Sequence, residues 1–72
     1  MHLIYQIITS VYVYSLYEEE GDVFLHVLNQ GTKKSRDIMH SDRILDVLFF
    51  DSEVTSEDYD TFEELVSEYK HC

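Results

Sequence analysis

The chain has 72 residues, of which 15 are Asp or Glu and 5 are Lys or Arg, and its formal net charge at pH 7 is −10. This length suffices for one domain, spanning residues 1–72, with a small core. Binding to nucleic acid or to an anionic membrane surface needs a positively charged face. The one short basic cluster, Lys33, Lys34 and Arg36, is followed at once by Asp37. The composition therefore predicts neither direct binding of nucleic acid nor membrane association.

Two further features bear on the cellular compartment. Cys72 is the only cysteine, which excludes a disulfide framework and fits the reducing cytosol. The apolar stretch 3–17 contains several polar residues and no Lys or Arg precedes it, unlike a secretion signal. It is also too short and too polar to cross a bilayer as a helix. We therefore expect a cytoplasmic protein.

The first half of the chain predicts a β-hairpin. Residues 3–17 are rich in Ile, Val, Tyr and Thr, which favour strands because branched and aromatic side chains pack well on a pleated surface. Polar residues within this stretch leave open one bent strand or two strands, over 3–8 and 11–17. A polar turn at Gly21, which tolerates positive φ, then leads into a returning strand over 23–28.

The middle of the chain is ambiguous. Residues 32–39 fit either a third, exposed strand or a loop. Ser41 suits the N-cap of a helix, and the apolar residues that follow it have helical spacing. A strand over 44–50 is the competing interpretation, because periodicity alone does not assign a short apolar run.

A second helix is predicted over 56–69. Thr55 or Ser56 can cap it, and Asp58 follows Thr55 by three residues, as in a capping box. Its apolar residues recur at helical spacing and form one stripe: Tyr59, Phe62, Leu65, Val66 and Tyr69. We therefore predict an α+β fold, in which an antiparallel β-hairpin or a three-stranded sheet is followed by one or two helices packed on one face.

Both faces of the predicted hairpin carry apolar side chains. Tyr12 and Tyr14 lie on one face and Val13 lies on the other. An antiparallel sheet with one solvated face normally alternates apolar and polar residues. We therefore expect the face that bears Tyr12 and Tyr14 to contact a partner or a second copy of the chain, as in a homodimer.

No motif for catalysis or for binding a metal or cofactor is recognisable. The Ser, Cys and His residues occur in no signature of nucleophilic catalysis, and no pair has the spacing of zinc ligands. Gly21 and Gly31 are too far apart to form a phosphate-binding loop. We expect His26 to be half-buried and bonded to backbone. The sequence thus predicts a protein that is not an enzyme and has no cofactor or metal.

The acidic residues concentrate near the C-terminal end, where no Lys or Arg occurs between Ile44 and Tyr69. On a helix, like charges three or four residues apart cost about 0.2–0.5 kcal/mol per pair. We interpret this unfavourable repulsion as a sign that the acidic residues have a function, and we predict that they bind a basic partner. The candidate contacts are Asp51, Glu53, Glu57, Asp58, Asp60, Glu63, Glu64 and Glu68. The alternative is an acidic face that only contacts solvent.

In size, charge and α+β outline the chain resembles the small acidic proteins by which phages and mobile elements block host defences. These are anti-CRISPR proteins, anti-restriction DNA mimics and uracil-DNA glycosylase inhibitors. The resemblance covers these global properties and includes no shared motif. It implies an inhibitor that mimics nucleic acid and blocks a nucleic-acid-binding enzyme. The alternative is a small cytosolic homodimeric adaptor or regulatory module, with the acidic helix as its solvated side.

Overall fold

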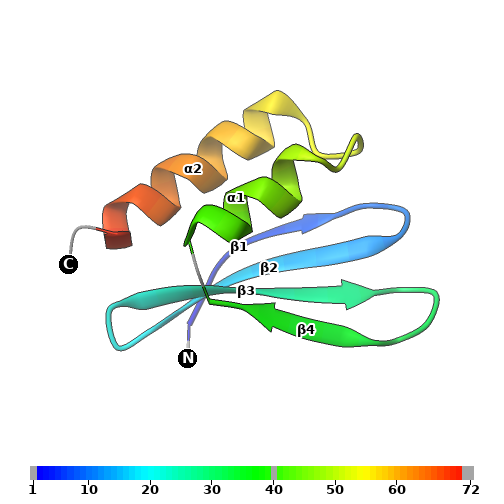
Figure 1. Ribbon diagram of the computed structural model, residues 1–72, viewed down its shortest axis with the longest axis horizontal. Helices are drawn as coiled ribbons and strands as arrows, with labels where there is room; N and C mark the ends of the chain where they lie inside the picture. The colour runs from blue at the N-terminus through cyan, green and yellow to red at the C-terminus, as the bar shows by residue number, and fades with distance from the viewer. Residues whose placement is uncertain (1, 40, 71–72) are drawn as a thin grey trace.

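Four strands and two helices follow one another along the chain. The computed structural model describes residues 2–39 and 41–70, with the side chains of Ser41, Tyr69 and Lys70 outside that description (Figure 1). The elements are β1 (His2–Ile8), β2 (Tyr12–Glu19), β3 (Asp22–Asn29), β4 (Ser35–Ile38), α1 (Ser41–Phe49) and α2 (Ser56–Lys70). The strands form one antiparallel sheet in chain order. Both helices lie over the same face of this sheet (Figure 1).

This arrangement confirms the predicted α+β fold and resolves the alternatives. The stretch 3–17 forms two strands because Thr9 closes a tight turn. Its Oγ1 accepts the backbone N–H of Tyr12 at 2.9 Å, and its own N–H donates to the Tyr12 carbonyl at 2.8 Å. The segment 32–39 contains the short strand β4, and the segment 44–50 is helical up to Phe49.

The turn between β2 and β3 consists of Glu20 and Gly21. Their φ angles are 54° and 87°. Positive φ at both positions is typical of a type I′ turn, whose twist matches that of the flanking strands. This turn fixes the register in which Leu16 of β2 lies opposite Leu25 of β3.

The hydrophobic core lies between the sheet and the two helices. Leu16 and Leu25 are fully buried at the centre of the sheet. The helical residues that cover them are equally buried: Ile44 and Leu48 of α1, and Phe62 and Val66 of α2. Tyr59 and Leu65, the other described members of the predicted α2 stripe, are half-buried against this core. The side chain of Tyr69 lies outside the description.

The first turn of α2 is fixed by Thr55 and by a contact with β1. Thr55 Oγ1 accepts the N–H of Asp58 at 3.1 Å, which identifies Thr55 as the N-cap. The Asp58 carboxylate accepts a hydrogen bond from the Tyr5 hydroxyl at 2.9 Å. The Tyr5 ring packs edge-on against Phe62, with 5.3 Å between the ring centroids. These contacts set the position of α2 across the sheet.

The prediction that Tyr12 and Tyr14 lie on an uncovered face is wrong. Tyr14 is 2% exposed and Tyr12 is half-buried, because α1 and the segment that follows it cover this side of the sheet. The period-2 pattern of a strand shows which side chains share a face, but not which face the helices cover. Whether the chain forms a dimer stays a prediction.

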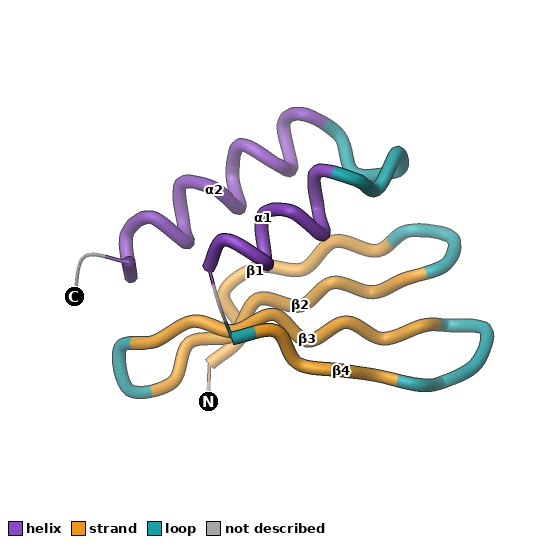
Figure 2. The backbone as a smooth tube through the Cα atoms, in the orientation of Figure 1, coloured by secondary structure: helices purple, strands orange, loops and turns teal. Residues whose placement is uncertain are grey.

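The opposite face carries no helix within the described chain (Figure 2). It protects part of its apolar surface by cross-strand packing. The Tyr17 ring stacks on Phe24, its partner in the sheet register, with 5.4 Å between centroids. Phe24 is buried as a result, whereas Leu3 and Ile8 stay 44% and 68% exposed.

Replacement of Phe62 by Ala tests the position of α2. Phe62 is 0% exposed, so Phe62→Ala leaves a cavity in the core and lowers the free energy of unfolding by about 3–5 kcal/mol. Urea denaturation followed by circular dichroism measures this loss. The matched control is Phe50→Ala, because Phe50 is 82% exposed. Equal effects of the two substitutions contradict the assignment of Phe62 to the core.

Candidate functional site

The eight predicted acidic contacts separate into two groups. Asp51, Glu53 and Asp58 accept hydrogen bonds from other parts of the fold. The remaining side chains are exposed on α2: Glu57, Asp60, Glu63, Glu64 and Glu68. None of these five forms an ion pair or a side-chain hydrogen bond within the described part of the chain. This second group is therefore the better candidate surface for a basic protein partner.

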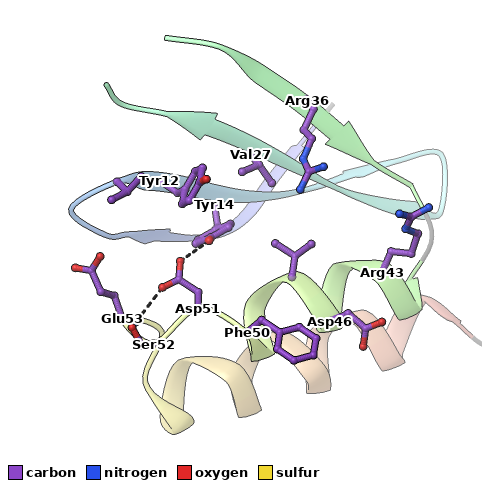
Figure 3. A pocket seen from close by; sticks show the side chains of 12 residues that line it. Tyr12, Tyr14, Val27, Arg36, Arg43, Asp46, Phe50, Asp51, Ser52 and Glu53 are labelled. Carbon is purple, nitrogen blue, oxygen red and sulfur yellow. Dashed lines mark hydrogen bonds between the residues drawn. The ribbon is translucent and has the colours of Figure 1, made fainter. Parts of the chain in front are cut away.

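Asp51 anchors the segment between α1 and α2 to the sheet. Its Oδ2 accepts a hydrogen bond from the Tyr14 hydroxyl, and its Oδ1 accepts the backbone N–H of Glu53 at 2.9 Å (Figure 3). Burial raises the pKa of Tyr14 above its ordinary value, and the hydrogen bond to Asp51 and the charge of Asp51 add to the rise. Tyr14 therefore stays protonated and acts as a donor in this contact at neutral pH.

Glu53 joins the same segment to the turn between β1 and β2. Its Oε2 accepts the Ser10 hydroxyl at 2.6 Å, and its Oε1 accepts the Ser10 N–H at 3.2 Å. The turn between β3 and β4 joins this end as well, because Gln30 Nε2 donates to the Thr9 carbonyl at 2.6 Å. Three connecting segments therefore meet at one end of the molecule (Figure 2).

The exposed acids of α2 form a stripe that points away from the core. Residues of a helix advance by about 100° each, so Glu57, Asp60, Glu64 and Glu68 fall within one narrow sector. The buried Phe62 and Val66 lie in the opposite sector. Because a helix rises about 1.5 Å per residue, the four carboxylates extend over about 16 Å. We call these four residues the acidic stripe; Glu63 lies beside it.

The basic side chains that the structure describes lie at the other side of the fold. Lys33 and Lys34 lie in the turn before β4, Arg36 lies in β4, and Arg43 lies near the start of α1. In Figure 1, β4 forms the sheet edge farthest from β1, whose Tyr5 contacts α2. The described basic side chains therefore do not neutralise the acidic stripe.

The structure also contains a cavity that the sequence did not predict. It lies between α1 and the strands β2, β3 and β4, and its volume is about 570 Å³. Tyr12, Tyr14, Arg36, Arg43 and Phe50 are among its lining residues (Figure 3). These residues are scattered along the sequence, so only the packing of α1 on the sheet brings them together.

His26 differs from its predicted environment. It is half-buried, as expected, but its Nδ1 lies 2.8 Å from a carboxylate oxygen of Asp37 instead of bonding to backbone. The two residues are partners in the β3–β4 register. Within the described chain, no group of three or more His, Cys, Asp and Glu side chains could hold a metal ion.

No helix within residues 2–39 and 41–70 is long and apolar enough to cross a bilayer. Comparisons with protein-family models, with curated proteins and with solved structures find no match for this chain.

The contact between Tyr14 and Asp51 predicts a specific response to alkaline pH. Because the folded protein holds the Tyr14 proton more tightly than the unfolded chain, stability is unaffected below the ordinary tyrosine pKa of 10.0. Above it, the free energy of unfolding falls by up to about 1.4 kcal/mol per pH unit for this proton. Urea denaturation between about pH 8 and about pH 11 measures the slope. Tyr14→Phe makes it shallower and, at neutral pH, lowers stability by about 1.5–3 kcal/mol. Identical slopes for both proteins contradict the assignment.

Proposed function

We propose that the protein is a small acidic inhibitor whose α2 helix occupies the basic groove of a nucleic-acid-binding enzyme in the cytoplasm. It would act in the manner of the anti-CRISPR and anti-restriction proteins of phages and mobile elements. The observation that carries this proposal is the acidic stripe: a line of exposed carboxylates with no ion-pair or side-chain hydrogen-bond partner in the described part of the chain. The three acids that hold the fold together, Asp51, Glu53 and Asp58, are not counted among the contacts.

The energetics of α2 support this proposal. Neighbouring acids of the stripe repel one another by about 0.2–0.5 kcal/mol per pair. A small domain has only about 5–15 kcal/mol of total stability, so several such pairs are a measurable loss. The burial of Phe62 and Val66 holds α2 on the sheet without help from its outer face. A basic groove would remove the repulsion by supplying opposite charges.

The geometry of the stripe suits a groove that accepts a nucleic acid strand. Carboxylates three or four residues apart on a helix have Cβ atoms about 5–6 Å apart, which approximates the regular spacing of phosphates along a strand. A groove that binds phosphates presents Lys and Arg side chains in a row. Electrostatic complementarity of this kind acts mainly on the association rate and weakens as salt screens the charges.

Charge reversal on the stripe tests the proposal. The triple variant Glu57→Lys, Asp60→Lys and Glu64→Lys keeps its fold, because all three side chains are exposed. Its binding to the target enzyme weakens by more than about tenfold, and the loss is largest at low salt. The measurement is capture of nucleic-acid-binding proteins from cell lysate on the immobilised protein, with duplex DNA as the competitor.

The matched control makes the same change in charge at the β2–β3 turn, away from α2. Glu19→Lys, Glu20→Lys and Asp22→Lys alter three exposed acids around the β2–β3 turn and leave α2 untouched. Equal losses in the two triple variants show that only net charge matters and refute the mimic. The proposal is also refuted if duplex DNA does not displace the captured proteins from the immobilised protein.

The uncovered sheet face favours a second candidate, a homodimeric adaptor or regulatory module. Leu3 and Ile8 are exposed on this face, where Leu3 lies opposite Tyr17 and Ile8 lies opposite the half-buried Val13. Exposed apolar patches commonly mark interaction surfaces. Analytical ultracentrifugation of the wild-type protein and of Ile8→Lys tests this candidate. A dimer that Ile8→Lys dissociates supports it, and a monomeric wild-type protein contradicts it.

A further inference from the structure

The cavity between α1 and the sheet has the size of a small-molecule site. Its volume of about 570 Å³ lies within the range of about 300–1,000 Å³ that is usual for ligand pockets. None of the acidic stripe residues lines it. A ligand here would therefore bind independently of the surface on α2.

Two arginines provide the cationic side of the cavity. Arg36 reaches in from β4 and Arg43 rises from α1 (Figure 3). Neither forms an ion pair within the described chain, although acids outnumber basic residues by 15 to 5. Both also line the adjoining depression along β4. Guanidinium groups present forked donors that match phosphate oxygens, so this pair favours a phosphate.

Aromatic and apolar side chains provide a second side. Phe50 lines the cavity and is 82% exposed, although a side chain of this kind normally avoids water. The half-buried Tyr12 and Val27 line the cavity from the strands, and Val47 lines it from α1, on the same side as Phe50 (Figure 3). Stacking of a nucleobase on an aromatic side chain contributes about 1–3 kcal/mol, so the site favours a flat ring as well as an anion.

The remaining side limits the charge of the ligand. Asp51, Ser52 and Glu53 line the cavity from the segment after α1, and Tyr14 and Ser10 hold the two carboxylates in place. Asp46 also lines it, with its carboxylate turned away from the strands (Figure 3). Fixed carboxylates repel a second anionic group and accept hydrogen bonds from amino and hydroxyl groups. The cavity therefore favours one anionic group joined to a neutral polar part.

We propose that this cavity binds a nucleoside 5′-monophosphate. Arg36 and Arg43 contact the phosphate, Phe50 and Tyr12 contact the base from opposite walls, and the Asp51–Glu53 segment accepts hydrogen bonds from the sugar or the base.

Titration of the isotope-labelled protein tests this site by amide chemical shifts. The probes are AMP, GMP, CMP and UMP, together with inorganic phosphate and adenosine. At least one nucleotide shifts the amide signals of Val47, Phe50 and Ser52 and binds with a Kd below about 1 mM. Phosphate and adenosine each bind at least tenfold more weakly, because each makes only part of the contacts.

Three substitutions locate the ligand. Arg36→Gln and Arg43→Gln each weaken nucleotide binding about tenfold or more, and Phe50→Ala weakens it severalfold. All three side chains are exposed, so the fold is retained and thermal melting verifies this. The control is Lys33→Gln, which removes the same charge from a residue that does not line the cavity and leaves the Kd unchanged.

Several outcomes overturn the proposal. It fails if none of the four nucleotides binds, or if inorganic phosphate binds as tightly as the best nucleotide. It also fails if Arg36→Gln combined with Arg43→Gln leaves the Kd unchanged. The signals of the same amides can also shift when the protein concentration alone is raised. If added nucleotide does not reverse these shifts, the cavity binds the acidic helix of a second copy instead. Substitutions in the acidic stripe leave nucleotide binding unchanged, because no stripe residue lines the cavity. The test of this site and the test of the proposed function therefore have separate outcomes.

Discussion

The packing of Phe62 and Val66 of α2 against Leu16 and Leu25 of the sheet is the contact on which the rest of the structure depends. A four-stranded meander of this length has little stability of its own, and it needs a covered apolar face. Because the buried side of α2 and the hydrogen bond from Tyr5 to Asp58 hold this helix in place, its outer face is free of structural tasks. The fold can therefore carry an unbroken line of negative charge there, at a cost that the core offsets.

The acidic residues of the C-terminal half serve two purposes in the structure. Those in the segment between the helices, Asp51 and Glu53, tie that segment to β2 and to the β1–β2 turn. By doing so they also build one wall of the cavity under α1. Those on the outer face of α2 form no ion pair or side-chain hydrogen bond with any described residue. Acidic residues only a few positions apart in the sequence therefore form one wall of the cavity and an exposed charged surface on α2.

Local patterns predicted much of this fold, and non-local contacts account for what they missed. β-Branched and aromatic residues identified the strand regions 3–17 and 23–28, although one bent strand or two stayed open for the first. The apolar stripe and a cap at Thr55 or Ser56 identified α2. The run at 44–50 was ambiguous because four adjacent apolar residues fit a buried strand as well as a helix. Tyr14 was placed on the wrong face because alternation does not reveal which side the helices cover. The bond between Ser10 and Glu53 joins residues 43 positions apart, and the presence of Arg36 and Arg43 in one cavity depends on how α1 packs. Neither leaves a local signal.

The order of the strands also has a consequence for synthesis. Each strand pairs with its neighbour along the chain, so the sheet can assemble as it leaves the ribosome. Its core face stays only partly covered until α2 packs on it, and the contact between Tyr5 and Asp58 joins residues 53 positions apart. A nascent chain that pauses before α2 exposes Leu16 and Leu25 to water and to other chains. Arrival of the last helix therefore ends the period in which the growing chain is prone to aggregate.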